Sequence, residues 1–360
     1  MNLHFTILGA GNGGQSLAGD LILRGFQVEA IYDRYPEMIE PIVEKDGITL
    51  VGKILEGFAP VNLATTDLQK AIDVADVLWV VVPAFAHEYI ATAAAPYLRD
   101  GQLIVLCPGY LGGTLAFRET LKKAGCQAEV QLAETMILPY ATRIVGPATV
   151  GVRAVKKWVE ISAFPATNTA RVVQTLQKAM PQFAPGPNIL ATGLNNPNPI
   201  MHVATALLNT GRFETSEAAG GFDFHEWISP SIARINDLID KERLAVVKKF
   251  GFDRISLSEF DQKSYDQAKQ VIQPQGPIPK GSGSVPPRYV IEDVPMGLVP
   301  LSQLARVAGV PTPTIDTMIN LACLVHQENY WQEGRTLQRL GLEGLSIPQI
   351  ITFVETGQPV

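Results

Sequence analysis

The segment HFTILGAGNGGQSLAGDLILRGFQVEAIYD, residues 4–33, decides the fold of the amino-terminal half of the chain. The apolar run His4–Leu8 is typical of a buried strand, and apolar residues recur at helical spacing across Gln15–Arg24. Gly25 ends that helix, and Val28–Tyr32 is a second apolar run. A strand, a helix and a strand within about 30 residues predict a βαβ unit and therefore a parallel sheet.

The glycine loop GAGNGG lies between the first strand and the helix, and Asp33 follows its last glycine by 19 residues. The loop has the spacing G-x-G-x-x-G, in which glycines allow a tight turn and let a helix N-terminus approach a pyrophosphate. An acidic residue at the end of the second strand can bind ribose hydroxyls. We therefore predict a dinucleotide-binding loop made of Gly9, Gly11, Asn12, Gly13 and Gly14.

The identity of the dinucleotide depends on two neighbouring residues of opposite charge. Asp33 favours NAD, because its carboxylate would repel the 2′-phosphate of NADP. Arg34 leaves NADP open, since an arginine at this place often accommodates that phosphate. We predict NAD, with NADP as the alternative.

Three more apolar runs continue the sheet, and helical stretches separate them. The runs are Val77–Val82, Leu103–Leu106 and Val130–Ala133. They predict an α/β fold with a Rossmann-type doubly wound parallel sheet. Ligands bind at the carboxyl ends of such strands, so Pro83, Ala84 and Pro108 are expected to border the cofactor, although Pro83 could equally be a strand stop.

The composition changes near APGP, residues 184–187, beyond which strand signals fade and helical patterns dominate. We predict a dinucleotide-binding domain over 1–185 and a helical substrate-binding domain over 186–360, with the site in the cleft between them. The segment Gln273–Arg288 contains five prolines, three glycines and two serines, which excludes regular structure throughout. It could close over the substrate or be a surface excursion.

The composition excludes several classes of protein. With 29 Lys+Arg against 35 Asp+Glu, the net charge is −6, and nucleic acid is not an expected partner. The longest uncharged apolar stretch is interrupted by Pro83, so no membrane helix is expected. Three cysteines far apart form neither a disulfide framework nor a metal site, and they indicate a reducing, cytoplasmic compartment.

A hydride-transfer enzyme needs an acid that protonates the heteroatom, and His202 is the leading candidate among five histidines. It ends the segment NNPNPIMH, residues 195–202, which leads into an apolar helix; a hydrogen-bonded core histidine is the alternative. No lysine occurs between Lys178 and Lys241 to serve instead. Arg288 and Asp293 in RYVIED form a second constellation, which could reach the cleft or form a surface ion pair.

Taken together, these segments resemble the opine dehydrogenase family, in particular its bacterial N-(1-D-carboxyethyl)-L-norvaline dehydrogenase type. The resemblance covers nearly the whole chain and includes LGAGNGG (8–14), VVVPA (80–84), PGYLGG (108–113), ETMILPYATR (134–143), NPNPIMH (196–202), RYVIEDVPMGLVPLSQL (288–304), VPTPTID (310–316) and EGRTLQRLGLEGL (333–345). It implies that an L-amino acid condenses with a 2-oxo acid, pyruvate being expected, and that NAD(P)H reduces the imine.

The resemblance also implies roles for single residues. His202 matches the proton-transferring histidine, Asp293 the carboxylate that pairs with it, and Arg288 an arginine that binds a substrate carboxylate. Arg143 and Arg212 are candidates for the second carboxylate, and Glu134 completes the expected cofactor contacts. The segments Arg212–Trp227 and Gln273–Pro287 match nothing specific enough to identify the amino acid.

Other interpretations stay open at this point. A 2-oxo acid or sugar-phosphate reductase of the ketopantoate or glycerol-phosphate kind would share the fold but depends on lysine at the site. A sensor that binds dinucleotide without chemistry is the non-enzymatic alternative. A homodimer through the helical domain is the expected assembly.

Overall fold

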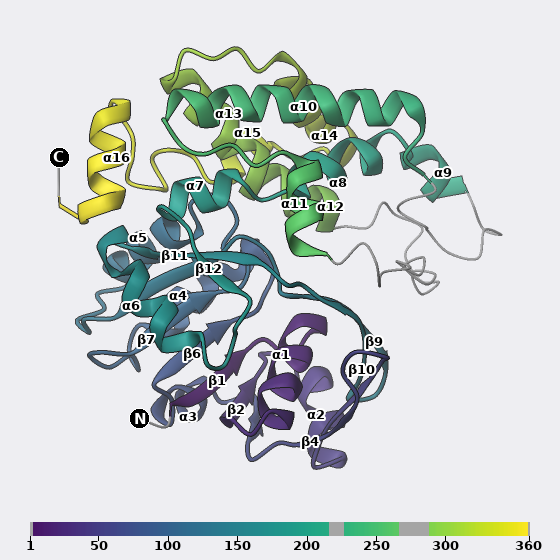
Figure 1. The fold of residues 1–360 in the computed structure, drawn as a ribbon, viewed down its shortest axis with the longest axis vertical. Helices are drawn as coiled ribbons and strands as arrows, with labels where there is room; N and C mark the ends of the chain where they lie inside the picture. Colours follow the sequence, from purple (N-terminus) through teal and green to yellow (C-terminus); the bar gives the residue numbers. More distant parts are fainter. Residues whose placement is uncertain (1–2, 216–226, 266–287, 359–360) are drawn as a thin grey trace. The chain divides into compact units, whose positions relative to one another are not determined.

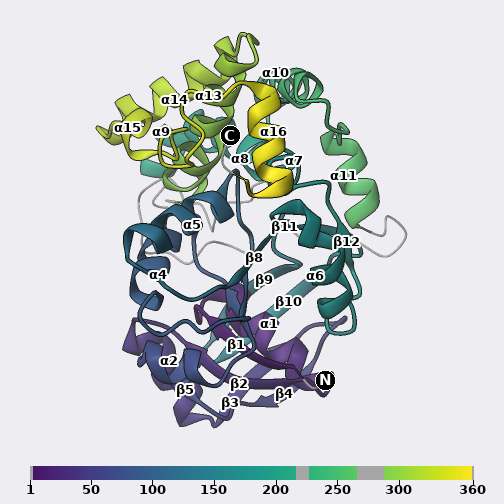
Figure 2. The ribbon, with the colours of Figure 1, turned by 90° about the vertical axis from the view of Figure 1, so that its left-hand side faces the viewer.

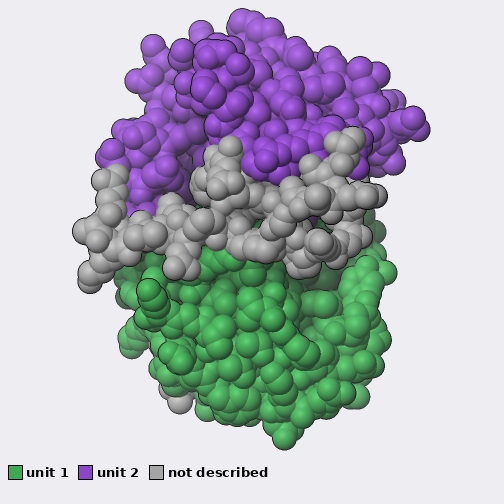
Figure 3. Space-filling view, turned by 90° about the vertical axis from the view of Figure 1, so that its right-hand side faces the viewer, with its two compact units in different colours: residues 1–192, 354–357 green, residues 193–353, 358–360 purple. Residues whose placement is uncertain are grey.

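The computed structural model describes residues 3–215, 227–265 and 288–358 of the chain (Figure 1). The chain forms two compact units, which Figure 3 colours separately. Unit 1 consists of residues 1–192 and 354–357, and unit 2 of residues 193–353 and 358–360. The proline- and glycine-rich segment predicted at Gln273–Arg288 lies, except for Arg288, outside the described residues.

Unit 1 is built on an eight-stranded sheet in the order β12-β11-β8-β7-β6-β1-β2-β5. From β1 the chain adds β2 on one side and β6 on the other, so the predicted doubly wound sheet is confirmed. The β11–β8 pair is antiparallel, and the remaining pairs are parallel. The strands are β1 (His4–Leu8), β2 (Gln27–Tyr32), β5 (Ala64–Thr65), β6 (Val77–Val80), β7 (Leu103–Leu106), β8 (Gln131–Thr135), β11 (Val159–Phe164) and β12 (Phe183–Pro185).

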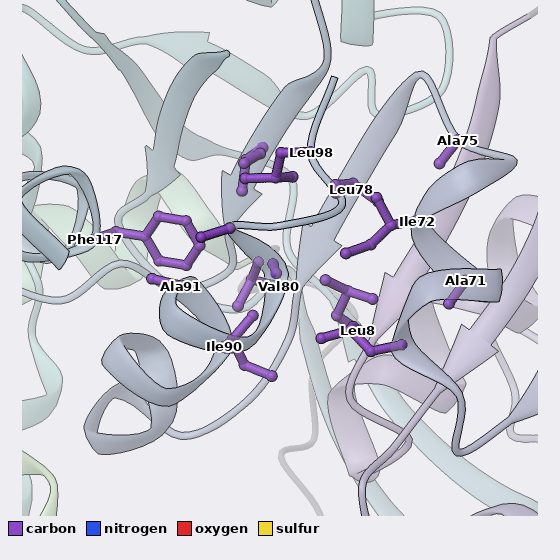
Figure 4. Packing of buried hydrophobic residues seen from close by; sticks show 14 of the residues in the cluster. Leu8, Ala71, Ile72, Ala75, Leu78, Val80, Ile90, Ala91, Leu98 and Phe117 are labelled. Carbon is purple, nitrogen blue, oxygen red and sulfur yellow. The ribbon is translucent and has the colours of Figure 1, made fainter. Parts of the chain in front are cut away.

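The core of unit 1 lies between this sheet and the helices that follow its strands. Leu8, Leu78 and Val80 of the central strands pack against Ile72 and Ile90, which come from two of the helices (Figure 4). All four residues of β6 and of β7 are buried, as expected for strands covered on both faces. The helices of unit 1 are α1 (Asn12–Leu23), α2 (Pro36–Glu44), α3 (Leu68–Asp73), α4 (His87–Ala94), α5 (Gly113–Lys123) and α6 (Thr169–Leu176), and α7 (Ile189–Leu194) crosses the boundary of the unit.

A second sheet of four strands, which the sequence did not reveal, packs against α1. Its order is β4-β3-β10-β9, and its strands mix buried residues with partly or fully exposed ones, so their apolar signal is weak. Gly19 of α1 permits the contact, because a Cβ there would overlap the side chain of Leu50. The strands are β3 (Gly47–Val51), β4 (Gly57–Pro60), β9 (Tyr140–Gly146) and β10 (Thr149–Val155).

In the described part of unit 2 every regular element is helical, which confirms the predicted all-α second half. The long helix α10 packs on α8 and α14 (Figures 1 and 2), and the short helix α12 packs on α8 (Figure 1). Ser229 caps α10, and Pro230 occupies its first turn. The elements are α8 (Asn198–Leu207), α9 (Thr210–Thr215), α10 (Pro230–Lys249), α11 (Leu257–Ser264), α12 (Arg288–Ile291), the π-helical turn η3 (Val294–Leu298), α13 (Val299–Val307), α14 (Pro313–His326), α15 (Tyr330–Glu333) and α16 (Ile347–Thr356), whose last residues belong to unit 1.

Two features typical of other protein classes are absent from the described residues. No helix among them has the length and apolar character required to cross a membrane. The same residues contain no group of three or more His, Cys, Asp or Glu side chains placed to hold a metal ion.

Candidate active site

The glycines of the loop in unit 1 have two different structural roles. Gly9 has a φ of +117°, and a Cβ there would overlap the carbonyl of Val81, while a Cβ on Gly14 would overlap the carbonyl of Gly9. Both glycines are therefore required by close backbone packing. Gly11 is different: it stands at the N-cap of α1, and an added Cβ would meet no atom within 4 Å. This open helix N-terminus fits the pyrophosphate of a dinucleotide.

The first residue of α1, Asn12, connects the loop to the smaller sheet. Its Oδ1 accepts a hydrogen bond of 2.7 Å from the backbone N–H of Ile144 in β9. An added Cβ on Gly13 would lie 2.9 Å from a methyl group of Leu138. The Asn12 side chain thus holds the loop in place. The cofactor contacts predicted for Asn12 and Gly13 would then come from their backbone N–H groups.

Asp33 lies at the carboxyl end of β2 and faces the loop. Its Oδ2 accepts a hydrogen bond of 2.8 Å from the backbone N–H of Ala10, and its Oδ1 accepts one of 3.1 Å from that of Tyr35. Each carboxylate oxygen can accept further hydrogen bonds, so this arrangement orients Asp33 for ribose hydroxyls.

The Arg34 side chain is held between two tyrosines. Its Cζ lies 4.8 Å from the ring centre of Tyr35 and 4.6 Å from that of Tyr89 in α4. Burial and the neighbouring hydroxyl of Tyr89 raise the pKa of Tyr32 to about 12, so this tyrosine stays neutral. The cation–π contacts restrict Arg34 at the place where the 2′-phosphate of NADP is expected. The arrangement is therefore compatible with NADP as well as with NAD.

The other predicted cofactor residues follow the central strands. Pro83 and Ala84 begin the turn Ala84–Ala86 after β6, and Pro108 follows β7. Glu134 is fully buried, and its Oε2 accepts a hydrogen bond of 2.6 Å from the N–H of Thr114. From β8, the Glu134 carboxylate thus accepts from the first turn of α5 and stabilises the N-terminus of that helix, a role that the sequence did not predict.

In unit 2 the structure brings His202 and Asp293 together. His202 lies in the second turn of α8, and its Nδ1 is 3.0 Å from Oδ2 of Asp293. Asp293 is 1% exposed, and the His202 side chain is 17% exposed. Because a carboxylate only accepts, we assign the hydrogen to Nδ1, which places the lone pair of the neutral ring on Nε2.

Arg288 has its own carboxylate, which the sequence analysis missed. Its Nε donates a hydrogen bond of 2.9 Å to Oε2 of Glu292; Arg288 is 55% exposed, whereas Glu292 is 2% exposed. The segment 288–293 is helical, not extended, so residues four apart share a face. Two adjacent buried carboxylates therefore each pair with one predicted site residue: Glu292 with Arg288, and Asp293 with His202. The i,i+4 spacing of Arg288 and Glu292 is the feature of the sequence that could have predicted their ion pair.

The remaining two predicted arginines belong to different units. Arg143 lies on β9 in unit 1. Arg212 lies on α9 in unit 2, where its Cζ is 3.8 Å from the ring centre of Trp227. The part of the predicted specificity segment at residues 216–226 lies outside the described residues.

A buried arginine anchors the polar segment that leads into α8. Arg243 of α10 donates to Oδ1 of Asp240 at 2.8 and 2.6 Å, to the carbonyl of Leu194 at 2.9 Å and to Oδ1 of Asn195 at 3.3 Å. It also donates to the carbonyl of Ile255 at 2.6 Å. Burial lowers the pKa of Arg243, and the Asp240 carboxylate opposes that effect. Arg243 thus fixes the start of the segment that ends at His202.

Known protein families match both units of the chain. Residues 185–326 match the family described as NAD/NADP octopine/nopaline dehydrogenase, alpha-helical domain, and residues 4–107 match the family described as NADP oxidoreductase coenzyme F420-dependent. The chain is 37% identical over 358 residues to an opine dehydrogenase of Arthrobacter sp. (strain 1C), covering 98% of each chain.

Solved structures share the fold. An octopine dehydrogenase in complex with NADH and agmatine matches with a TM-score of 0.74 at 23% identity, covering 99% of each chain. A yersinopine dehydrogenase with NADP⁺ bound matches with a TM-score of 0.70 at 16% identity, covering 98% of each chain.

Proposed function

The chain belongs to the opine dehydrogenase family, an NAD(P)-dependent group of oxidoreductases that act on CH–NH bonds, and on this premise we propose its reaction and the residues that perform it. An L-amino acid condenses with a 2-oxo acid, for which pyruvate is the expected partner, and the resulting imine is reduced to a secondary amine. The observation that carries this proposal is the His202–Asp293 pair in the helical unit of the chain.

The chemistry assigns one task to each member of the pair. Condensation joins the amine nitrogen to the keto carbon with loss of water, and NAD(P)H, when bound, supplies the hydride that this carbon receives. Nε2 of His202 donates a proton in the condensation and reduction steps and accepts one in the reverse oxidation. Asp293 accepts from Nδ1–H, which fixes the tautomer and stabilises the positive charge of the protonated ring.

Both substrates carry a carboxylate, and arginine suits such groups because its planar fork binds two oxygens. We assign one carboxylate to Arg288, whose orientation is set by Glu292. Arg143 and Arg212 are the candidates for the other. Exchange of Arg288 for lysine keeps the charge but loses the fork, so we expect the KM for one substrate to rise more than kcat falls.

The cofactor is expected to be held by the open N-terminus of α1 and by Asp33. NAD is the preferred form because of this carboxylate, and Arg34 between its two tyrosines supports use of NADP as well. Titration of the protein with NADH and with NADPH, for the parent chain and for Arg34→Ala, measures this preference directly.

The experiment that tests the proposed function uses purified protein, NADH, pyruvate and a panel of L-amino acids. We expect NADH oxidation only when both substrates are present, with a product whose mass corresponds to the secondary amine. Oxidation with pyruvate alone would indicate a 2-hydroxy acid dehydrogenase instead. A reductase of the ketopantoate or glycerol-phosphate kind would respond to neither combination.

A pair of histidine variants separates catalysis from simple binding. His202→Asn should lower turnover about 10²- to 10⁴-fold, the usual contribution of general acid–base catalysis, with the Kd for NADH unchanged. His326→Asn is the matched control, because His326 lies in α14 of the same unit and contacts Tyr330 instead of a carboxylate. A non-catalytic sensor would show no turnover and no difference between the two variants.

The compartment and the assembly belong to the same proposal. We place the reaction in the cytoplasm, since Cys107, Cys126 and Cys323 are free thiols. A homodimer through the helical unit is the expected assembly, and light scattering of the purified protein measures it.

A further inference from the structure

We propose that Tyr289 positions the imidazole of His202 for proton transfer, as a second contact besides Asp293. This inference rests on the proposed function, because it concerns the histidine to which that function assigns the proton. The ring centres of Tyr289 and His202 are 4.2 Å apart, and the ring planes make an angle of 38°. The contact is closer than the 4.5–7 Å typical of aromatic pairs.

A single hydrogen bond does not fix the orientation of an imidazole. The Nδ1–Oδ2 bond to Asp293 sets the tautomer of His202, but the ring can still rock about the line that joins the two atoms. A neighbouring ring face opposes that motion by van der Waals contact over the width of the imidazole. Nε2, the atom to which the proposed function assigns the proton, lies off that line, so rocking of the ring displaces it.

Tyr289 and Asp293 come from one short stretch of helical backbone. They are four residues apart, which places both side chains on the same face and directs both toward α8. One stretch therefore supplies the hydrogen bond and the ring contact to His202, so the two restraints share a common frame. On the same stretch Arg288 pairs with Glu292.

Tyr289 is itself held by a buried tryptophan. Trp227 is buried and packs against Tyr289 and against Met201, the residue directly before His202. The guanidinium of Arg212 lies over the same tryptophan. Trp227 thus contacts α12 at Tyr289 itself and α8 at the residue next to His202. The ring contact between Tyr289 and His202 is therefore part of a larger packed cluster that includes Trp227.

Two variants of Tyr289 separate its ring from its hydroxyl. Tyr289→Leu removes the flat face, and we expect kcat to fall about 10- to 100-fold, the scale of a misplacement of roughly 1 Å, with little change in KM. Tyr289→Phe keeps the face and should restore kcat to within about threefold of the parent chain on the same scale. A loss in Tyr289→Phe as large as in Tyr289→Leu would overturn the proposal, because the hydroxyl would then be the acting group.

A double variant tests whether Tyr289 acts through His202. In a His202→Asn background we expect Tyr289→Leu to have no further effect on turnover, since the group that it positions is gone. Equal losses in both backgrounds would contradict a positioning role. Phe252→Leu is the control for loss of an aromatic ring in the same unit, because Phe252 stacks on Phe250 and not on a histidine.

A measurement without turnover keeps this inference distinct from the proposed function. With histidine-labelled protein, the Hε1 resonance of His202 is assigned from its absence in His202→Asn. We expect that resonance to shift in Tyr289→Leu and to stay near its parent position in Tyr289→Phe, because the ring current is retained. An unchanged resonance in Tyr289→Leu would refute the ring contact, even if the enzyme accepted no substrate in the panel.

Discussion

Replacement of Arg243 by methionine should destabilise unit 2 and impair catalysis together. Methionine keeps most of the length and apolar volume of the arginine side chain but removes the guanidinium. Arg243 is 2% exposed, and its loss leaves Asp240, Asn195 and the carbonyls of Leu194 and Ile255 without their donor. Removal of one partner of a buried ion pair typically costs about 3–5 kcal/mol of unfolding free energy.

The expected change in melting temperature follows from the size of the unit. For a domain of about 150–250 residues, 1 kcal/mol shifts the melting temperature by about 2–4 °C, so we expect a decrease of about 6–20 °C. Arg243→Met should also lower kcat below the melting transition, because the segment that ends at His202 loses its anchor at Leu194 and Asn195. The Kd for NADH should not change.

The assay combines thermal unfolding by circular dichroism with steady-state kinetics at a temperature where both proteins are folded. Arg234→Met is the matched control: Arg234 lies on the same helix, is exposed, and donates to Oγ of Ser231. We expect its melting temperature to change by less than about 2 °C, as is usual for surface substitutions. A similar small change in Arg243→Met would refute the assignment of Arg243 as the anchor.

Three further predictions concern the cofactor loop, a histidine and the thiols. Gly14→Ala should lower the melting temperature, because the added Cβ would overlap the Gly9 carbonyl. Gly11→Ala should leave the melting temperature unchanged and weaken NADH binding at least about tenfold, since the methyl group would occupy the place of the phosphate. Equal effects of the two variants in both assays would contradict the separate roles of the two glycines. Burial lowers the pKa of His326 below its usual 6.5, so the unfolded chain binds the proton more tightly than the folded chain does. The free energy of unfolding should therefore fall as the pH drops below 6.5. Denaturant titrations at several pH values should show a smaller fall for His326→Asn. Burial raises the pKa of the Cys107 thiol to about 12. A thiol reagent should therefore label Cys126 and Cys323 in the folded protein and Cys107 only after denaturation. Labelling of Cys107 at the rate of Cys126 would disprove its burial.

The sequence predicted the central sheet well because its strands are fully buried. Val77–Val80 and Leu103–Leu106 are apolar at every position, and their ends in the structure lie within two residues of the predicted ends. The smaller sheet was missed because its strands carry mixed residues; Val145 on β9 and Phe58 on β4 are exposed. The end of α14 at His326 is another feature that the sequence did not predict, because it depends on the left-handed φ of 56° at Gln327, which is not a glycine.

The candidate site shows the same division. The glycine loop and Asp33 are set by a local pattern, since they come from one strand, helix and strand in succession. His202 and Asp293 are 91 residues apart, and the residues alone left open whether they meet. Glu292 and Tyr289 were not predicted, because a buried carboxylate and a ring contact become visible only when the packing is known.

By itself, the sequence determined the inner strands of the eight-stranded sheet, the Rossmann-type half and the helical half, and its motifs carried the resemblance to the family. The strands and the two halves follow from the spacing of apolar residues and glycines over stretches of about 30 residues or fewer, where backbone geometry fixes the outcome. Only the tertiary structure decided which charge serves which group: Asp293 holds His202, Glu292 holds Arg288, and Arg243 holds the segment before α8. The physical reason is that side chains distant in sequence meet through the packing of several helices, and burial then determines the strength of their interaction.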